Sequence, residues 1–133
     1  MKPIMSIDEL QKLVMPFRQR IEKIKLSNPP ADFTWYGYDI LNNIGALGGL
    51  LTGKNREIFD SLVGKHLADI GAADGDLRFF LETFGIKPHI IDYGPTNWNG
   101  LKGAKRLKEL LQSNVEIHEI DLDSQFRLPF EQY

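Results

Sequence analysis

The sequence predicts an α/β protein in which a helical segment precedes a small parallel sheet. Apolar residues recur at helical spacing through the first thirty positions, and from Lys65 short apolar strands alternate with amphipathic helices. The chain has 133 residues, 42% of them hydrophobic, which is typical of one globular domain. We expect residues 1–64 to form an N-terminal helical cap and residues 65–133 to form the sheet, packed as one compact unit.

The first helix is indicated by the segment from Ser6 to Glu9, a capping-box pattern in which the serine and glutamate side chains bond reciprocally to backbone N–H groups. The apolar stripe behind it consists of Leu10, Leu13, Val14, Phe17, Ile21 and Ile24. Pro16 lacks a backbone donor and predicts a kink or a break. We expect the stripe to pack on the domain rather than on a partner.

Residues 27–30, with the sequence Ser-Asn-Pro-Pro, end the helical region. The aromatic run at 33–38 follows, and two interpretations remain open: it plugs the core, or it lines a ligand site. Two short helices are expected next, at 39–51 and at 54–62, and Gly64 suits the C-terminal cap of the second.

The second part reads as strand, helix, strand, helix, strand. The strands are expected at 66–70, 88–92 and 115–122, with the helices after Gly75 and Gly100. Strands that alternate with helices of this length form parallel units with right-handed crossovers. We therefore expect a partial parallel sheet with the spatial order 3-2-1.

Composition excludes several classes of function. The absence of cysteine excludes disulfides, thiolate catalysis, zinc–thiolate sites and iron–sulfur clusters. The net charge of −2 excludes a globally basic nucleic-acid binder. No apolar run is long enough to span a bilayer, and we expect a soluble, cytoplasmic protein without membrane partners.

Two groups of residues are interpreted as structural. The three histidines, His66, His89 and His118, are scattered and show no short metal-binding spacing, so we expect no metal site. The basic face from Lys102 to Lys108 is expected to be a solvated surface, with guidance of RNA as the alternative.

Chemistry is concentrated where the strands end. Asp69-Ile-Gly71-Ala-Ala73-Asp-Gly75 runs from the first strand through a glycine-rich turn into a helix. Asp92 ends the second strand, and Asp121 lies at the expected end of the third. Because ligands of open parallel sheets bind at the carboxyl ends of the strands, these carboxylates are expected on one edge. Asp92 suits the vicinal hydroxyls of a ribose, and Tyr93 offers a flat face to an adenine ring.

The turn differs from a dinucleotide-binding turn in spacing and in charge. Small residues occupy every second position, instead of the G-x-G-x-x-G pattern. Asp69, Asp74 and Asp76 crowd the turn with negative charge. Such a turn is expected to repel a pyrophosphate and to favour a cofactor with a cationic centre.

With these motifs, residues 67–122 resemble the class I S-adenosylmethionine-dependent methyltransferases. The resemblance implies a Rossmann-like three-layer fold, and S-adenosylmethionine as the cofactor. It implies that Asp69 organises the turn and the amino-acid end of the cofactor, and that the backbone at Gly71, Ala73 and Gly75 passes beneath the cofactor. It further implies that Asp92 holds the ribose and that Tyr93 packs on adenine. Asp121 and Leu122 match the end of the family's third strand, where an acid meets the adenine amino group. It implies transfer of a methyl group to an acceptor that the sequence does not identify.

The chain departs from this family in having no fourth strand, so it resembles the cofactor-binding half of a methyltransferase. The first strand is then an exposed apolar edge, and we expect a homodimer or association through that edge. No catalytic residue is assignable; Tyr36, Tyr38 and Asn42 are candidates for closing over the cofactor. The alternatives are a non-catalytic cofactor-binding or protein-interaction fragment, and a fragment of an NAD-dependent dehydrogenase.

Overall fold

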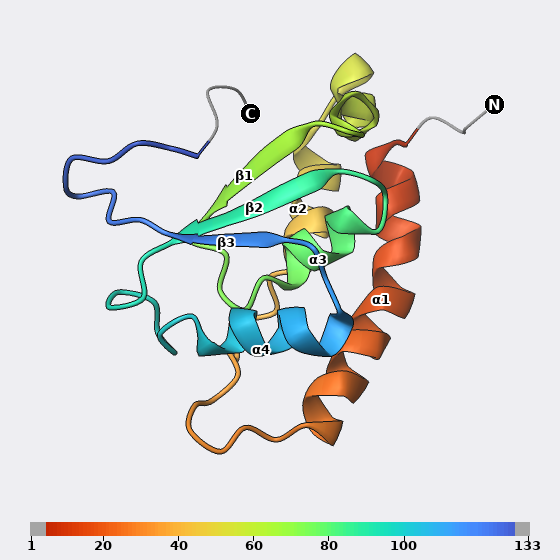
Figure 1. Cartoon of the computed structure of the whole chain (residues 1–133). Coiled ribbons are helices and arrows are strands. Elements are labelled where there is room, and N and C mark those ends of the chain that lie inside the picture. Colours follow the sequence, from red (N-terminus) through yellow and green to blue (C-terminus); the bar gives the residue numbers. More distant parts are fainter. Residues whose placement is uncertain (1–4, 130–133) are drawn as a thin grey trace.

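The computed structural model describes residues 5–129. The helices and strands are, in chain order, α1 (Ile7–Ser27), α2 (Asn42–Leu50), the 3₁₀ helix η1 (Gly53–Leu62), β1 (His66–Ile70), α3 (Asp76–Glu82), β2 (Lys87–Asp92), α4 (Lys102–Leu111) and β3 (Glu116–Glu119). The chain is thus mixed α/β, with three helical elements before the first strand (Figure 1).

The strands form one small open sheet in which both pairs are parallel. Their order is β1-β2-β3, which is the predicted order 3-2-1 read from the opposite edge. β3 ends at Glu119, three residues earlier than predicted. The reason is a turn at Asp121, whose carboxylate accepts a hydrogen bond from the N–H of Asp123 at 3.0 Å and whose carbonyl accepts one from the Ser124 hydroxyl at 2.8 Å.

α3 and α4 lie on the same side of the sheet, as two successive right-handed crossovers require (Figure 1). Ile90 faces these helices, because a Cβ added to Gly75 at the start of α3 would lie 2.8 Å from the Ile90 side chain. Side chains alternate between the faces of a sheet. The neighbouring residues His89 and Ile91 therefore face the opposite side.

α1 begins with the predicted cap, in which the Ser6 hydroxyl accepts a hydrogen bond from the Glu9 N–H at 3.3 Å. The helix continues through Pro16 to Ser27, so the alternative of a break at Pro16 is wrong. Pro16 is exposed while Val14 and Phe17 are buried. Water can therefore bond to the carbonyl that Pro16 leaves without a partner. Burial of the apolar side chains before and after Pro16 keeps the chain helical through this position.

Apolar side chains of the cap and of the sheet pack in one cluster, which extends from Met5 to Val115. Within it the rings of Phe17 on α1 and Phe80 on α3 have centroids 5.2 Å apart. This packing holds α1 against α3, and Lys25 near the end of α1 donates to Asp76 at the start of α3, beside the glycine-rich turn. Among residues 5–129, no helix is both long enough and apolar enough to cross a membrane.

Candidate functional site

The turn between β1 and α3 uses left-handed backbone at alternate positions. Gly71 has φ +73°, Ala73 has φ +54° and Gly75 has φ +85°. The alternation of small residues in the sequence thus coincides with the alternation of backbone conformation, which only small residues adopt at low cost. Ala73 is the one of the three with a Cβ. A hydrogen bond joins the start of the turn to β2, with the Gly71 N–H donating to the Ile91 carbonyl at 3.1 Å.

A hollow of about 150 Å³ lies at the carboxyl ends of the three strands. Five of the residues assigned to cofactor binding line it, namely Gly71, Asp92, Tyr93, Asp121 and Leu122. The rest of its wall consists of Ile70, Ile91, Thr96, Ile120 and Asp123. A Cβ added to Gly71 would meet no atom within 4 Å, so the space in front of this backbone is open. The arrangement offers carboxylates, a phenol ring and apolar surface to one ligand.

Asp92 is held by hydrogen bonds from its own loop. One carboxylate oxygen accepts from the Tyr93 N–H at 2.8 Å, and the other accepts from the Asn97 side-chain amide at 2.9 Å. Each oxygen of a carboxylate has a second acceptor site, so two remain for a ligand. Asn97 is buried and its own oxygen accepts from the N–H of Leu101 at 2.9 Å. Sequence reasoning did not find this positioning residue.

Asp69 does not line the hollow. Its carboxylate is buried and forms an ion pair with Arg78 of α3, with 2.5 Å between Oδ2 and Nε. Ala73 and Gly75 also lie outside the wall of the hollow. Of the three strand-end carboxylates, the structure therefore brings Asp92 and Asp121 together, while Asp69 lies between β1 and α3.

The acidic residues of the turn are matched by cations, which weakens the predicted excess of negative charge. Lys25 of α1 donates to Asp74 at 3.3 Å and to Asp76 at 3.1 Å, in addition to the pairing of Asp69 with Arg78. All three carboxylates are buried. The negative charge expected to repel a pyrophosphate is therefore smaller than predicted, because three carboxylates share the two cations Lys25 and Arg78. The spacing argument is unaffected.

Burial raises the pKa of Asp76 above its ordinary 3.8, and the charge and hydrogen bond of Lys25 oppose this shift. Asp74 beside it has two further partners. The backbone N–H of Tyr36 donates to it at 2.8 Å, and the side-chain amide of Asn99 donates at 2.8 Å. Asp74 therefore connects α1, the aromatic segment and the loop after β2.

The aromatic segment contacts the loop that carries Asn97. The Tyr36 hydroxyl accepts a hydrogen bond from the Trp98 N–H at 2.8 Å, and the two rings meet edge to face with centroids 5.2 Å apart. Burial raises the pKa of Tyr36, with smaller contributions from Asp92 and Asp74, while the bond from Trp98 lowers it. Tyr38 bonds instead to Asn43, and Asn42 accepts from Arg18, both outside the hollow.

The basic face of α4 is largely neutralised. Lys102 pairs with Asp32 at 3.3 Å, Lys105 with Glu119 at 3.2 Å, and Arg106 with Glu109 at 3.0 Å. These partners favour the interpretation of a solvated surface over guidance of RNA.

Comparison of the chain with protein-family models, with curated proteins and with solved structures found no match.

Proposed function

We propose that the chain binds S-adenosylmethionine at the hollow beyond β1, β2 and β3, as the cofactor-binding part of a Rossmann-like methyltransferase. The observation that carries the proposal is the gathering of Gly71, Asp92, Tyr93, Asp121 and Leu122 around one hollow. In this proposal the ribose bonds to Asp92, and adenine lies between Tyr93 and the segment at 121–122. The methyl group is already activated by the sulfonium, so the protein contributes alignment and exclusion of water.

Three features support a nucleoside in this hollow. The carboxylate of Asp92 is fixed in position by Tyr93 and Asn97 and keeps acceptor capacity for two ribose hydroxyls. The left-handed turn at Gly71 leaves backbone facing open space. Ligands of open parallel sheets bind at this end of the strands.

Calorimetric titration of the full chain with S-adenosylhomocysteine and, separately, with NAD tests the proposal. Binding of the first alone is expected. Binding of NAD alone would support the dehydrogenase alternative, which the pairing of the acidic residues makes electrostatically easier. Absence of both would contradict any nucleoside site here.

Asp92→Ala is expected to weaken S-adenosylhomocysteine binding about tenfold or more, because hydrogen bonds to a charged group contribute about 1.5–3 kcal/mol each. Asp92→Asn keeps the shape of the side chain. It therefore separates the effect of losing the charge from the effect of losing the hydrogen bonds that hold the loop after β2. The matched control is Glu109→Ala, which removes an exposed carboxylate on α4. Circular dichroism checks folding of all three variants. An unchanged dissociation constant in both Asp92 variants would remove the ribose assignment.

The second candidate function is protein interaction through β1. β2 is the only strand paired with β1 in residues 5–129, and Ile70 at its end is 60% exposed. An unpaired apolar edge strand favours pairing with another chain. Light scattering after size exclusion is expected to give the mass of a dimer, and Ile70→Lys is expected to give a monomer. A monomeric parent chain at millimolar concentration would contradict self-association.

A further inference from the structure

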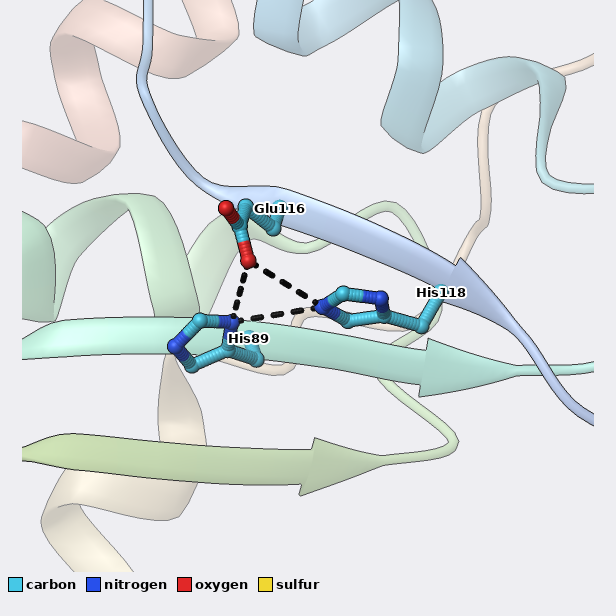
Figure 2. A group of neighbouring side chains, drawn as sticks. All are labelled: His89, Glu116 and His118. Carbon is cyan, nitrogen blue, oxygen red and sulfur yellow. Dashed lines mark hydrogen bonds and ion pairs between the residues drawn. The ribbon is translucent and has the colours of Figure 1, made fainter. Parts of the chain in front are cut away.

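Three polar side chains converge on the face of the sheet away from α3 and α4. They are His89 of β2 and Glu116 and His118 of β3 (Figure 2). Their nearest atoms form a triangle. His89 Nδ1 lies 3.1 Å from Glu116 Oε2 and 3.3 Å from His118 Nε2, and the third side, between His118 Nε2 and Glu116 Oε2, measures 3.3 Å.

The strand register explains this convergence. His89 pairs with Glu116, and His118 lies two residues further along β3, so all three residues share one face. In the sequence they are separated by up to 29 positions. Only parallel pairing of β2 with β3 brings them together, which is why the spacing of the histidines did not reveal the group.

The triangle has the dimensions of three ligands of one tetrahedral metal ion. With zinc–nitrogen and zinc–oxygen bonds of about 2.0–2.1 Å, neighbouring ligand atoms of a tetrahedron lie about 3.3–3.4 Å apart. The observed sides of 3.1, 3.3 and 3.3 Å are close to that value. Figure 2 shows the two ring nitrogens and the carboxylate oxygen directed toward one another. Little rearrangement would be needed to place an ion above the triangle.

A second histidine interaction orients the most buried of the three ligands. His66 of β1 places its Nδ1 2.6 Å from His89 Nε2. For His89 Nδ1 to bind a metal, its ring proton must be on Nε2, and that proton then has His66 Nδ1 as its acceptor. Metal-binding histidines in proteins are held in this way by a partner on the other ring nitrogen. His66 is thus a positioning residue in this arrangement.

The group is open to solvent on one side. His66, His89 and Glu116 also line a hollow of about 420 Å³ at the start of the strands, remote from the one beside Asp92. The His89 side chain is 5% exposed, that of His118 is 24% exposed and that of Glu116 is 55% exposed. The buried His89 would hold the ion from the side of the sheet. On the exposed side, next to Glu116, the fourth coordination position of the ion would be open to water.

We propose that His89, Glu116 and His118 form a site for a divalent transition-metal ion, with zinc as the expected occupant. Two imidazoles and one carboxylate suit zinc, and three protein ligands with one open position are the arrangement found where zinc binds water or a small ligand. Binding requires the two ligating nitrogens, Nδ1 of His89 and Nε2 of His118, to be without protons, so any proton held between the three ligand atoms is released to water. This site is independent of nucleoside binding.

The test uses the full chain without a histidine tag, stripped of metal with a chelator. Zinc chloride is titrated in competition with a chromophoric chelator, and cobalt chloride is titrated while the visible spectrum is recorded. We expect one equivalent of each metal to bind, with the cobalt complex showing the intense visible bands of tetrahedral coordination. Absence of zinc binding at millimolar metal would overturn the proposal.

Variants assign the ligands. His118→Gln and Glu116→Gln are each expected to weaken zinc binding by about 100-fold or more, since loss of a residue that only orients a ligand already costs about 10–100-fold. His66→Gln is expected to weaken zinc binding by only about 10–100-fold and to keep the tetrahedral cobalt spectrum. Glu119→Gln is the matched control, because it removes an exposed carboxylate of β3 that pairs with Lys105 on the other face. Unfolding curves of the metal-free variants check that each chain folds. Equal zinc affinity in His118→Gln, Glu116→Gln and Glu119→Gln would overturn the site.

Discussion

Replacement of Lys25 by methionine is expected to lower the free energy of unfolding by about 3–5 kcal/mol at neutral pH, because it leaves two buried carboxylates without their cation. Asp74 is 1% exposed and Asp76 is 7% exposed, and Lys25 donates to both. Methionine keeps most of the length and apolar stem of the lysine, so the change removes mainly the charge. Urea unfolding followed by circular dichroism measures the loss.

The loss is expected to decrease as the pH falls. The pKa of Asp76 in the folded chain is raised above its ordinary value of 3.8. The stability that Asp76 contributes is therefore fully present below pH 3.8, and it is lost as the pH rises through the folded-state pKa. Without Lys25 the main opposing influence disappears, and the folded pKa rises further. Unfolding energies of the variant and the parent chain should therefore approach each other toward pH 4.

Two further variants separate charge from packing. Lys23→Met, at an exposed position of the same helix, is expected to change stability by less than about 0.5 kcal/mol. Asp76→Asn added to Lys25→Met is expected to recover part of the loss, since one of the two unpaired charges is removed. Equal unfolding energies for Lys25→Met and Lys23→Met would contradict the assigned role of Lys25.

The second large effect is expected from Gly103→Ala, at the start of α4. The added Cβ would overlap Oδ1 of Asp74 and would lie 2.6 Å from the Asn99 side-chain nitrogen. Asp74 cannot retreat, because Lys25, the Tyr36 N–H and Asn99 hold it. Overpacking of this kind costs about 1–3 kcal/mol or more, which exceeds the helix-propensity gain of about 1 kcal/mol from replacing glycine.

Gly45→Ala is the matched control for this variant. Gly45 lies inside α2, and a Cβ there would meet no atom within 4 Å. The same substitution is therefore expected to stabilise the chain by about 0.4–1 kcal/mol. Thermal unfolding of both variants should give shifts of opposite sign. A stabilising effect of Gly103→Ala would show that α4 moves away from Asp74 without cost.

The sequence allowed prediction of those features that depend on local pattern. Alternating apolar strands and helices predicted the parallel sheet. Of the three carboxylates predicted to gather at the strand ends, Asp92 and Asp121 line one hollow, whereas Asp69 pairs with Arg78 instead. Features that depend on distant partners were not predictable. Lys25 lies 49 positions before Asp74, and nothing in the turn itself indicates that its charge is matched. The convergence of His89 with His118 depends on register, which the pattern of each strand leaves open.

Asp74 has a consequence for how the chain loses its structure. Its three donors come from the first helix, from the segment before α2 and from the loop after β2. Loss of any one of these donors would leave the buried Asp74 carboxylate with fewer hydrogen bonds and no water to replace them. Separating the helical segment before β1 from the sheet is therefore costly. We expect the helical segment and the sheet to unfold together in a single cooperative transition.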